Sequence, residues 1–325
     1  MRFGPEWTPA RLRRATDVAA GVRLFEIEPE GGPLPYAPGA HIRVTVVAGE
    51  TPDSRSYSLV GAAAADGAYR IAVKRLADSR GGSAYLWSLA EGARLAVTAP
   101  ANLFELTHGR PDYLLVAGGI GITPLVGMAE VLARRGARVR LAYAARRREE
   151  MAFLDQLSAL LGERLSLHVS AEGRRLDLAA EIAALDPAGE LYLCGPMRLQ
   201  EAVRAAWADA RRPATRLRSE TFGSSGRFGA VPFLVRVPRL GLEVVVPENR
   251  TMLEALSEAG ADLMYDCRRG ECGLCALDVL AVDGALDHRD VFFSDAEKQE
   301  NRKICACVSR AAGGAVVVDT ADRER

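Results

Sequence analysis

The sequence contains no uninterrupted run of about 18 or more apolar residues, the length that a membrane-spanning helix needs. Residues 1–6 lack the apolar segment of a signal peptide. Basic and acidic residues number 42 each, so no overall positive charge attracts nucleic acid, and no Lys/Arg-rich tract suggests a membrane anchor. These absences predict a cytoplasmic protein that binds neither nucleic acid nor membrane.

The four histidines are scattered and show neither the H-x-E nor the H-E-x-x-H spacing of metal sites. Six cysteines are present, and in a chain predicted to be cytoplasmic they argue against a disulfide framework. Four of the cysteines form one spaced set, which indicates a metal site instead.

This set begins with Cys267, Cys272 and Cys275, whose spacing is C-x4-C-x2-C, and continues with Cys305, 30 positions further on. Four thiolates can enclose the two irons of a [2Fe–2S] cluster, and this spacing is known from plant-type ferredoxins. The loop also contains two glycines, which we expect to let the backbone approach the sulfides. The set therefore predicts a plant-type [2Fe–2S] cluster.

Two alternatives stay open at the cysteine set. A structural zinc site usually contains two C-x2-C pairs, whereas this sequence has one. Cys307 lies two residues beyond Cys305 and competes with it as the fourth ligand. We choose Cys305 for its distance from Cys275 and interpret Cys307 as a small buried apolar residue.

The pattern of apolar and polar residues changes twice along the rest of the chain. Residues 1–108 contain short alternating runs separated by Gly/Pro turns, which is typical of an antiparallel barrel. Residues 109–222 alternate apolar strands with amphipathic helices, which indicates a parallel α/β sheet. Residues 223–231 are rich in Gly and Ser and predict a flexible linker. Residues 232–325, which begin with a hairpin pattern and a helix, contain the cysteine set.

A glycine loop lies early in the α/β part, where an apolar strand runs through Gly118, Gly119 and Gly121 into a helix. This strand, glycine loop and helix form the context that a dinucleotide phosphate site requires, because free amides at a helix start bind phosphate. We expect Thr123 to cap this helix. The loop departs from the Rossmann fingerprint because Pro124 stands where the third glycine would be.

A second strand of the α/β part ends in Cys194, Gly195 and Pro196. Ligands of open α/β sheets bind beyond the carboxyl ends of the strands, so this end is a candidate for the same site. A core cysteine before a Gly-Pro turn is the alternative.

Two patterns in the barrel part suggest anion and ring binding. Arg55 and Tyr57 lie two residues apart on one face of a strand, where Arg can pair with a phosphate and Tyr can lie against a ring. The stretch Arg80-Gly-Gly-Ser83 offers further donors to an anion. An ordinary strand and a plain turn are the alternatives.

The chain resembles the phthalate dioxygenase reductase family, which includes the vanillate O-demethylase reductases. The resemblance rests on four motifs in this order and combination: Arg55-Ser-Tyr-Ser58, the glycine loop, Cys194-Gly-Pro196 and the cysteine set. The resemblance covers essentially the whole chain. It implies a multidomain α+β and α/β fold with a flavin-binding β-barrel, a parallel-sheet NAD-binding domain and a C-terminal β-grasp ferredoxin domain. It also implies FMN, because relatives with the ferredoxin domain at the N-terminus carry FAD.

The resemblance further assigns residues to cofactors. By position, the residues implied at the flavin are Arg55, Tyr57, Ser58, Lys74 and Phe222, with Arg80, Gly81, Gly82 and Ser83 at its phosphate. Residues 118–123 would face the NADH pyrophosphate, and Cys194 would act beside the nicotinamide. NADH is expected by resemblance, but Arg146, Arg147 and Arg148 follow the second strand of the α/β part, where an arginine can accommodate the 2′-phosphate of NADPH. A solvated helix start is the alternative for these three residues.

These parts predict the reductase component of a multicomponent oxygenase. NADH donates two electrons and a [2Fe–2S] cluster accepts one, so a flavin is needed between them. We expect a monomer that passes electrons from NADH through FMN and the cluster to a Rieske-type oxygenase, and that docks through Arg268, Arg269 and Glu271. A cytochrome P450 as acceptor, a zinc-stabilised nucleotide-binding module and a reductase of small acceptors are the alternatives.

Overall fold

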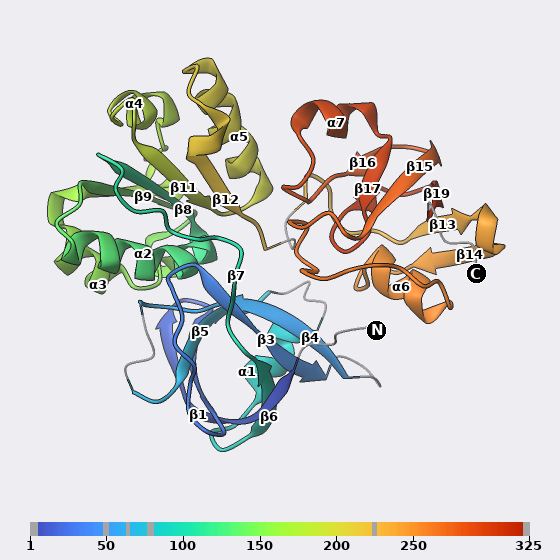
Figure 1. Ribbon diagram of the computed structural model, residues 1–325, viewed down its shortest axis with the longest axis horizontal. Coiled ribbons are helices and arrows are strands. Elements are labelled where there is room, and N and C mark those ends of the chain that lie inside the picture. The colour runs from blue at the N-terminus through green and yellow to red at the C-terminus, as the bar shows by residue number, and fades with distance from the viewer. Residues whose placement is uncertain (1–5, 48–51, 63–65, 77–80, 223–225, 321–325) are drawn as a thin grey trace. The chain divides into compact units, whose positions relative to one another are not determined.

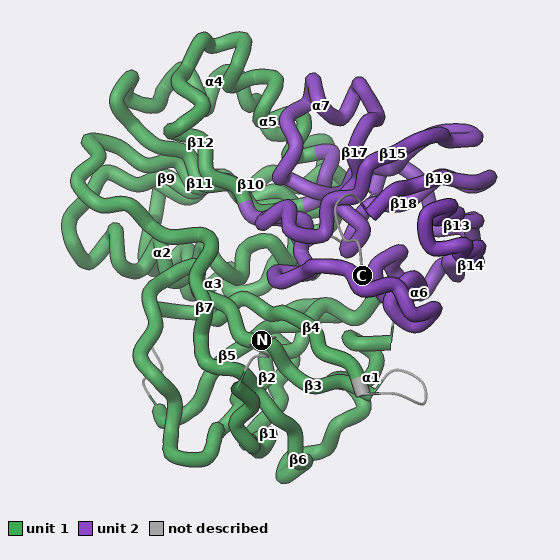
Figure 2. Tube along the Cα trace, turned by 45° about the vertical axis from the view of Figure 1, so that its right-hand side comes forward, with its two compact units in different colours: residues 1–195, 199–219 green, residues 196–198, 220–325 purple. Residues whose placement is uncertain are grey.

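The computed structural model describes residues 6–47, 52–62, 66–76, 81–222 and 226–320 (Figure 1). The chain divides into two compact units, coloured separately in Figure 2. Unit 1 comprises residues 1–195 and 199–219, and unit 2 comprises residues 196–198 and 220–325. Within the described ranges, no helix is long and apolar enough to cross a membrane.

Unit 1 begins with a seven-stranded antiparallel sheet in the order β4-β3-β6-β1-β2-β5, with β7 beside β3. Its elements are β1 (Trp7–Ala19), β2 (Val22–Pro29), β3 (Ala40–Val47), β4 (Pro52–Ser58), β5 (Tyr69–Lys74), α1 (Gly82–Ser88), β6 (Arg94–Thr98) and β7 (Ala101–Asn102). Leu59, directly after β4, forms a bridge with Ile71 of β5 and so closes the sheet on itself. Alternate residues such as Phe25 and Ile27 fill the interior, as the predicted barrel requires.

The second sheet of unit 1 has the order β10-β9-β8-β11-β12. Its strands are β8 (Tyr113–Gly118), β9 (Val139–Ala145), β10 (Leu165–Val169), β11 (Glu190–Cys194) and β12 (Leu217–Glu220). The pairs from β10 to β11 are parallel, and every residue of β8 and β11 is buried, as expected for strands covered on both faces.

Helices cover both faces of this sheet. They are α2 (Thr123–Arg134), α3 (Leu154–Leu161), α4 (Leu178–Ala183) and α5 (Met197–Asp209). Figure 1 shows α2 and α3 on one side of the sheet and α4 and α5 on the other. The short 3-10 turns in the described ranges of the chain are η1 (Gly119–Ile122), η2 (Arg148–Glu150), η3 (Gly162–Arg164), η4 (Ser170–Glu172), η5 (Ala214–Arg216) and η6 (Pro238–Leu240).

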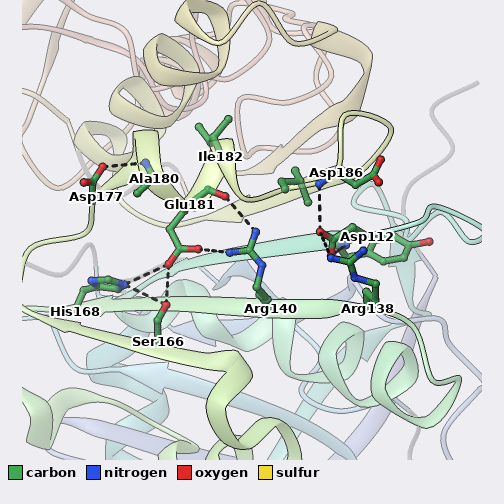
Figure 3. A network of polar contacts seen from close by, with 12 residues as sticks. Asp112, Arg138, Arg140, Ser166, His168, Asp177, Ala180, Glu181, Ile182 and Asp186 are labelled. Carbon is green, nitrogen blue, oxygen red and sulfur yellow. Dashed lines mark hydrogen bonds and ion pairs between the residues drawn. The ribbon is translucent and has the colours of Figure 1, made fainter.

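A polar network fixes α4 on β9 and β10 (Figure 3). Arg140 donates to the Glu181 carboxylate at 2.8 Å and to the Glu181 carbonyl at 3.2 Å. Ser166 donates to the same carboxylate at 3.2 Å, and the His168 ring lies 3.1 Å from the Ser166 hydroxyl. Asp177 caps the start of α4 through the Ala180 amide at 3.0 Å. His168 is thus part of a structural contact.

Unit 2 contains a five-stranded sheet in the order β14-β13-β19-β15-β17, in which β13 and β19 are parallel. Its elements are β13 (Phe233–Val237), β14 (Leu242–Val246), α6 (Met252–Glu258), β15 (Ala276–Val282), β16 (Leu286–Asp287), α7 (Asp295–Glu300), β17 (Lys303–Cys305), β18 (Arg310–Ala311) and β19 (Ala315–Asp319). A capping box between Thr251 and Glu254 starts α6. Val235 and Leu256 lie in the common core. A hairpin, a helix and a central parallel strand make up the predicted β-grasp arrangement.

Residues 226–228, within the predicted flexible linker, lie against the body of unit 2. The amide of Arg227 donates to Asp287 at 2.8 Å, and Arg289 pairs with Asp287 at 2.7 Å and donates to the Phe228 carbonyl at 3.2 Å. A Cβ on Gly226 would lie 2.0 Å from the Asp287 carboxylate. Gly226 therefore provides space for a buried ion pair, and residues 223–225 of the predicted linker lie outside the described residues.

Gly127 in α2 gives the first testable prediction. A Cβ at Gly127 would lie 2.4 Å from the carbonyl oxygen of Gly61, so the helix touches the backbone of the barrel there. Alanine for glycine inside a helix normally stabilises by about 1 kcal/mol. We expect Gly127→Ala instead to destabilise the protein by about 1 to 3 kcal/mol because of overpacking, measured by thermal unfolding of the flavin-loaded chain.

Arg134, exposed in the last turn of α2, supplies the control. Arg134→Ala should change the stability by less than about 0.5 kcal/mol. A Gly127→Ala protein with an unchanged or higher melting temperature would show that the two backbones are not held together at this point.

Candidate functional site

The glycine loop and the end of β11 meet because β8 and β11 are adjacent parallel strands. Cys194 lies opposite Ala117 in the register. A Cβ on Gly121 would lie 2.3 Å from the Cys194 carbonyl oxygen, and one on Gly195 would lie 3.1 Å from the Gly118 backbone. The strand order reverses between β8 and β11, and open α/β sheets bind ligands at such a point. The structure therefore brings together the two loops that the sequence singled out.

Thr123 does not cap α2, and this prediction is wrong. Ile122 is the N-cap residue and Thr123 is the first residue of the helix. The Thr123 hydroxyl donates to the Ile120 carbonyl at 3.1 Å. The 3-10 turn η1 precedes α2 directly, so the hydroxyl satisfies a carbonyl of that turn rather than an amide of the helix.

Arg146 lies just beyond β9, which is the neighbour of β8. It is exposed, and within the described part of the chain no acidic side chain pairs with it. Arg147 lies 4.0 Å from Glu149, and Arg148 makes two hydrogen bonds to Glu172 at 2.9 and 2.8 Å. Of the three successive arginines, Arg146 is therefore the one available to a ligand at this edge.

In the barrel, the structure brings Arg55 to the glycine turn before α1. A Cβ on Gly82 would lie 2.7 Å from Cγ of Arg55, so the arginine side chain passes directly over the turn. Arg55 also forms an ion pair with Asp53. Ser83 is buried in the same turn, Gly81 precedes it with a φ of 87°, and Arg80 lies outside the described residues.

The other barrel residues assigned by resemblance follow β4 and β5. Tyr57 packs against the barrel core and Ser58 is buried at the end of β4. Lys74, the last residue of β5, pairs with Glu150 of η2 at 2.8 Å. Phe222 is half-buried and belongs to unit 2, together with Pro196.

The cysteine loop lies between α6 and β15 and wraps around Cys267. The amides of Arg269, Glu271 and Cys272 each lie 3.4 Å from the Cys267 sulfur and donate to it. A positive φ of 53° at Arg268 turns the loop so that these amides converge. Converging amide donors stabilise a thiolate, which is the form that binds iron.

The expected role of the loop glycines is changed by the structure. A Cβ on Gly270 would lie 2.6 Å from Val308, and one on Gly273 would lie 2.2 Å from the Phe292 ring. Both have positive φ, 76° and 73°. They let the loop pack against protein atoms, while non-glycine residues supply the amides to Cys267.

The sulfur contacts group Cys307 with the loop cysteines. The Cys307 thiol hydrogen-bonds to Cys267 and is the main cause that lowers the pKa of Cys267 to about 5. Cys305 and Cys307 both hydrogen-bond to Cys275 and lower its pKa to about 3. Thus Cys307 contacts two loop cysteines. Cys305, the last residue of β17, lies opposite Ala276 in the sheet and contacts Cys275. These contacts favour Cys307 over our choice of Cys305, which rested on sequence distance alone.

Of the predicted docking residues, Arg269 is buried, so its proposed surface role is wrong, and Glu271 is half-buried beside it. Arg269 forms an ion pair with Glu220 and lies 3.3 Å from Glu271. Burial raises the pKa of Glu271 to about 8, and its carboxylate accepts from the Thr221 amide at 3.4 Å. Arg268 is partly exposed but pairs with the α6 carboxylate Glu254 at 2.8 Å. Sequence analysis missed this network because Glu220 is 49 residues away in the chain.

Exposed apolar side chains adjoin the cluster loop instead. Leu274, between two cysteines, is 48% exposed. Phe292 lies over Gly273 and is 47% exposed. Met264 and Tyr265 precede the loop and are also exposed. The loop therefore presents these apolar groups to the outside, beside the exposed Asp266.

Comparisons with known proteins agree with this arrangement. Residues 235–312 match the family model of the 2Fe-2S iron-sulfur cluster binding domain. The chain is 36% identical to a toluene-4-sulfonate monooxygenase system reductase subunit of Comamonas testosteroni, over 96% of this chain and 98% of that protein. It is 33% identical to phthalate dioxygenase reductase, a modular structure for electron transfer from pyridine nucleotides to [2Fe–2S], with a TM-score of 0.75 over 96% of this chain and 98% of that one.

A type IV self-sufficient cytochrome P450 monooxygenase is also similar. The identity is 33% and the TM-score 0.66, over 96% of this chain. This chain spans 41% of that longer protein.

The Arg269–Glu220 pair gives the prediction of this section. Removing one partner of a buried ion pair leaves an uncompensated charge and costs about 3 to 5 kcal/mol. We expect Glu220→Gln and Arg269→Met each to destabilise unit 2 by that amount, and the double variant to lose less than the sum. Urea unfolding of the full chain, followed by the loss of cluster absorbance, measures this.

The exposed pair Arg239–Asp319 in the same unit, at 2.7 Å, is the matched control. Arg239→Met should cost less than about 1 kcal/mol, because solvent screens the charges. Equal losses for the two arginine variants would contradict a structural role for the buried pair.

Proposed function

Since this chain belongs to the family of oxygenase reductases that carry electrons from NADH through a flavin to a [2Fe–2S] cluster, we propose that it serves a Rieske-type oxygenase in this way. The observation that carries the proposal is that one chain contains both kinds of loop. A glycine loop of the type that binds nucleotides lies where the strand order reverses in unit 1, and a cysteine loop whose amides stabilise a thiolate lies in unit 2. Residues 1–108 would hold FMN, residues 109–222 NADH and residues 232–325 the cluster, with residues 223–231 between the last two.

The NADH site would lie beyond β8 and β11. Amides of residues 118–123 would bind the pyrophosphate, and the absent side chain of Gly121 would keep Cys194 close to that loop. Cys194 and the following Gly195 and Pro196 would line the nicotinamide position. The unpaired Arg146 would face the adenosine half of the nucleotide.

The flavin site would use the barrel. The Arg55 guanidinium and the glycine turn beneath it offer charge and backbone donors to a phosphate, and their close contact supports this fit. Tyr57 would lie against the ring system. Lys74, Arg80 and Phe222 keep the flavin-contacting roles that the resemblance implies. Bound FMN supplies the conversion between a two-electron donor and a one-electron acceptor.

The cluster site would use Cys267, Cys272, Cys275 and Cys307. We propose Cys307 as the fourth ligand because its thiol contacts both Cys267 and Cys275. The donor set fits a cluster, since two of these thiols have lowered pKa values and three amides point at one of them.

The partner would approach the apolar outer side of the cluster loop, at Leu274 and Phe292. Both are exposed, and both lie directly at the loop that would hold the cluster. A cytochrome P450 is the second candidate acceptor, supported by the similarity to a self-sufficient P450 monooxygenase over 96% of this chain.

The test of this function is a coupled turnover. The purified chain should contain FMN and two irons with labile sulfide, oxidise NADH faster than NADPH, and support product formation by a purified Rieske-type oxygenase. Light scattering of the same preparation checks the proposed monomer, and cell fractionation checks the cytoplasmic location. A purified protein with zinc and no labile sulfide would contradict the function. Product formation with a cytochrome P450 but not with a Rieske-type oxygenase would instead identify the P450 as the electron acceptor.

Leu274→Glu tests the docking position. We expect transfer to the oxygenase to slow by about tenfold, equivalent to about 1.4 kcal/mol of lost docking energy, with flavin reduction by NADH unchanged. Leu280 lies on β15 outside the cluster loop and is 58% exposed, so Leu280→Glu is the control and should leave both steps unchanged. Equal slowing by both variants would reject this docking position.

Alanine variants decide the fourth ligand. Cys307→Ala should lose most of the iron and labile sulfide, because three thiolates leave one iron incompletely bound. Cys305→Ala should keep two irons per chain. Iron and sulfide analysis of proteins purified under anaerobic conditions measures this, and the opposite result would restore Cys305 as the ligand.

A further inference from the structure

Asp53 is a carboxylate of the barrel whose role the proposed function leaves open. It lies two residues before Arg55 in β4, and the two residues are opposite Val46 and Val44 of β3, which are both fully buried. Residues that are opposite each other in a ladder share one face of the sheet, so Asp53 and Arg55 lie on the inner face of the barrel. Their side chains are only 20% and 16% exposed.

Asp53 holds one end of the Arg55 guanidinium. Nη1 of Arg55 donates to Oδ2 of Asp53 and, at 2.9 Å, to the Ser54 carbonyl. The carboxylate is itself held in place, because its Oδ1 accepts from the Ser54 amide at 2.7 Å. Two acceptors at one nitrogen restrict a long side chain that would otherwise occupy many rotamers.

The remainder of the Arg55 side chain lies over Gly82. A Cβ on Gly82 would lie 2.7 Å from Cγ and 3.2 Å from Nε of Arg55. Nε is therefore on the side of the glycine turn, whereas Nη1 is the atom that contacts Asp53. Arginine binds a phosphate best through a fork of two parallel N–H groups. Because the guanidinium is planar and rigid, the contacts at Nη1 determine where the fork of Nε and Nη2 points.

We propose that Asp53 is a positioning residue that holds the Arg55 guanidinium in the orientation in which it binds the 5′-phosphate of FMN. This role rests on the proposed function, in which Arg55 and the glycine turn bind that phosphate. An arginine that is already ordered loses less side-chain entropy when a ligand binds, so its affinity for the ligand is higher.

The charge of Asp53 has the opposite effect, because a carboxylate repels a phosphate. Salt screens this repulsion more strongly than it screens the short, partly buried ion pair with Arg55. At physiological salt we therefore expect the ordering of Arg55 to dominate. The sign of the change in affinity on removing Asp53 distinguishes the two effects.

The consequence is selectivity for a phosphorylated flavin. Riboflavin lacks the 5′-phosphate, so an ordered Arg55 does not improve its binding. Asp53 should therefore raise the affinity for FMN relative to that for riboflavin. A residue that only stabilised the barrel would affect the binding of both flavins alike.

Fluorescence titration with FMN and with riboflavin tests this role in the full chain, after removal of bound flavin and with the cluster retained. Asp53→Ala removes the acceptor, and we expect the dissociation constant for FMN to rise about tenfold while that for riboflavin stays unchanged. Asp53→Val, whose side chain is favoured in strands, should give the same result and serves if the alanine variant does not fold. Asp53→Asn keeps an acceptor oxygen and should raise the FMN constant by less than about threefold.

Two further proteins serve as controls. Glu26→Ala breaks another ion pair of the barrel, in which Glu26 is 19% exposed and accepts from Arg13 at 2.9 Å, and it should leave both dissociation constants unchanged. Arg55→Met should itself weaken FMN binding. Adding Asp53→Ala to Arg55→Met should weaken it no further, because Asp53 acts through Arg55.

Three results would overturn this role. They are an unchanged FMN constant in Asp53→Ala, equal weakening of FMN and riboflavin binding, and tighter FMN binding, which would make Asp53 a competitor of the phosphate for Arg55. The unaltered protein keeps this test distinct from that of the function. If it bound no flavin, the function itself would be rejected, whereas any of the three results in a chain that binds FMN rejects only the role of Asp53.

Discussion

Contacts made directly against the backbone of glycine residues hold the parts of both units in place. Gly121 touches the end of β11, Gly127 touches the barrel and Gly82 lies under Arg55, each at a distance that a Cβ would make impossible. In unit 2, Gly273 lies under the Phe292 ring. Such contacts are possible because glycine has no Cβ, so a neighbouring backbone or side chain can lie directly against the main chain. The candidate sites therefore depend on glycine at these positions.

Buried ion pairs also hold segments of unit 2 together. Arg269 pairs with Glu220 under the cluster loop, and Arg289 pairs with Asp287 where residues 226–228 join unit 2. Ion pairs in such surroundings contribute geometry more reliably than net stability, because desolvation opposes their attraction. The outer side of the loop presents apolar groups such as Leu274 beside the exposed Asp266.

The cysteine loop contains both close contacts at glycine and a buried ion pair. Three amides and neighbouring thiols supply hydrogen bonds to Cys267 and Cys275, so the protein stabilises thiolates before any metal is considered. The two cysteines of the neighbouring segment differ in their contacts, since Cys307 contacts two loop cysteines and Cys305 contacts one from inside the sheet.

The features that depend on local pattern could be predicted from the amino-acid sequence. The alternation of apolar and polar residues at 233–246 predicted β13 and β14, and the succession of strands and helices in residues 109–222 predicted the parallel sheet. The cysteine spacing indicated a [2Fe–2S] cluster. The contacts between distant segments could be seen only in the folded chain. It put Cys307 rather than Cys305 against two loop cysteines, and it buried Arg269 against Glu220. Spacing along the chain reports on local geometry, whereas which of two nearby thiols reaches a loop, or which charge is buried, depends on how strands from distant parts of the chain pack together.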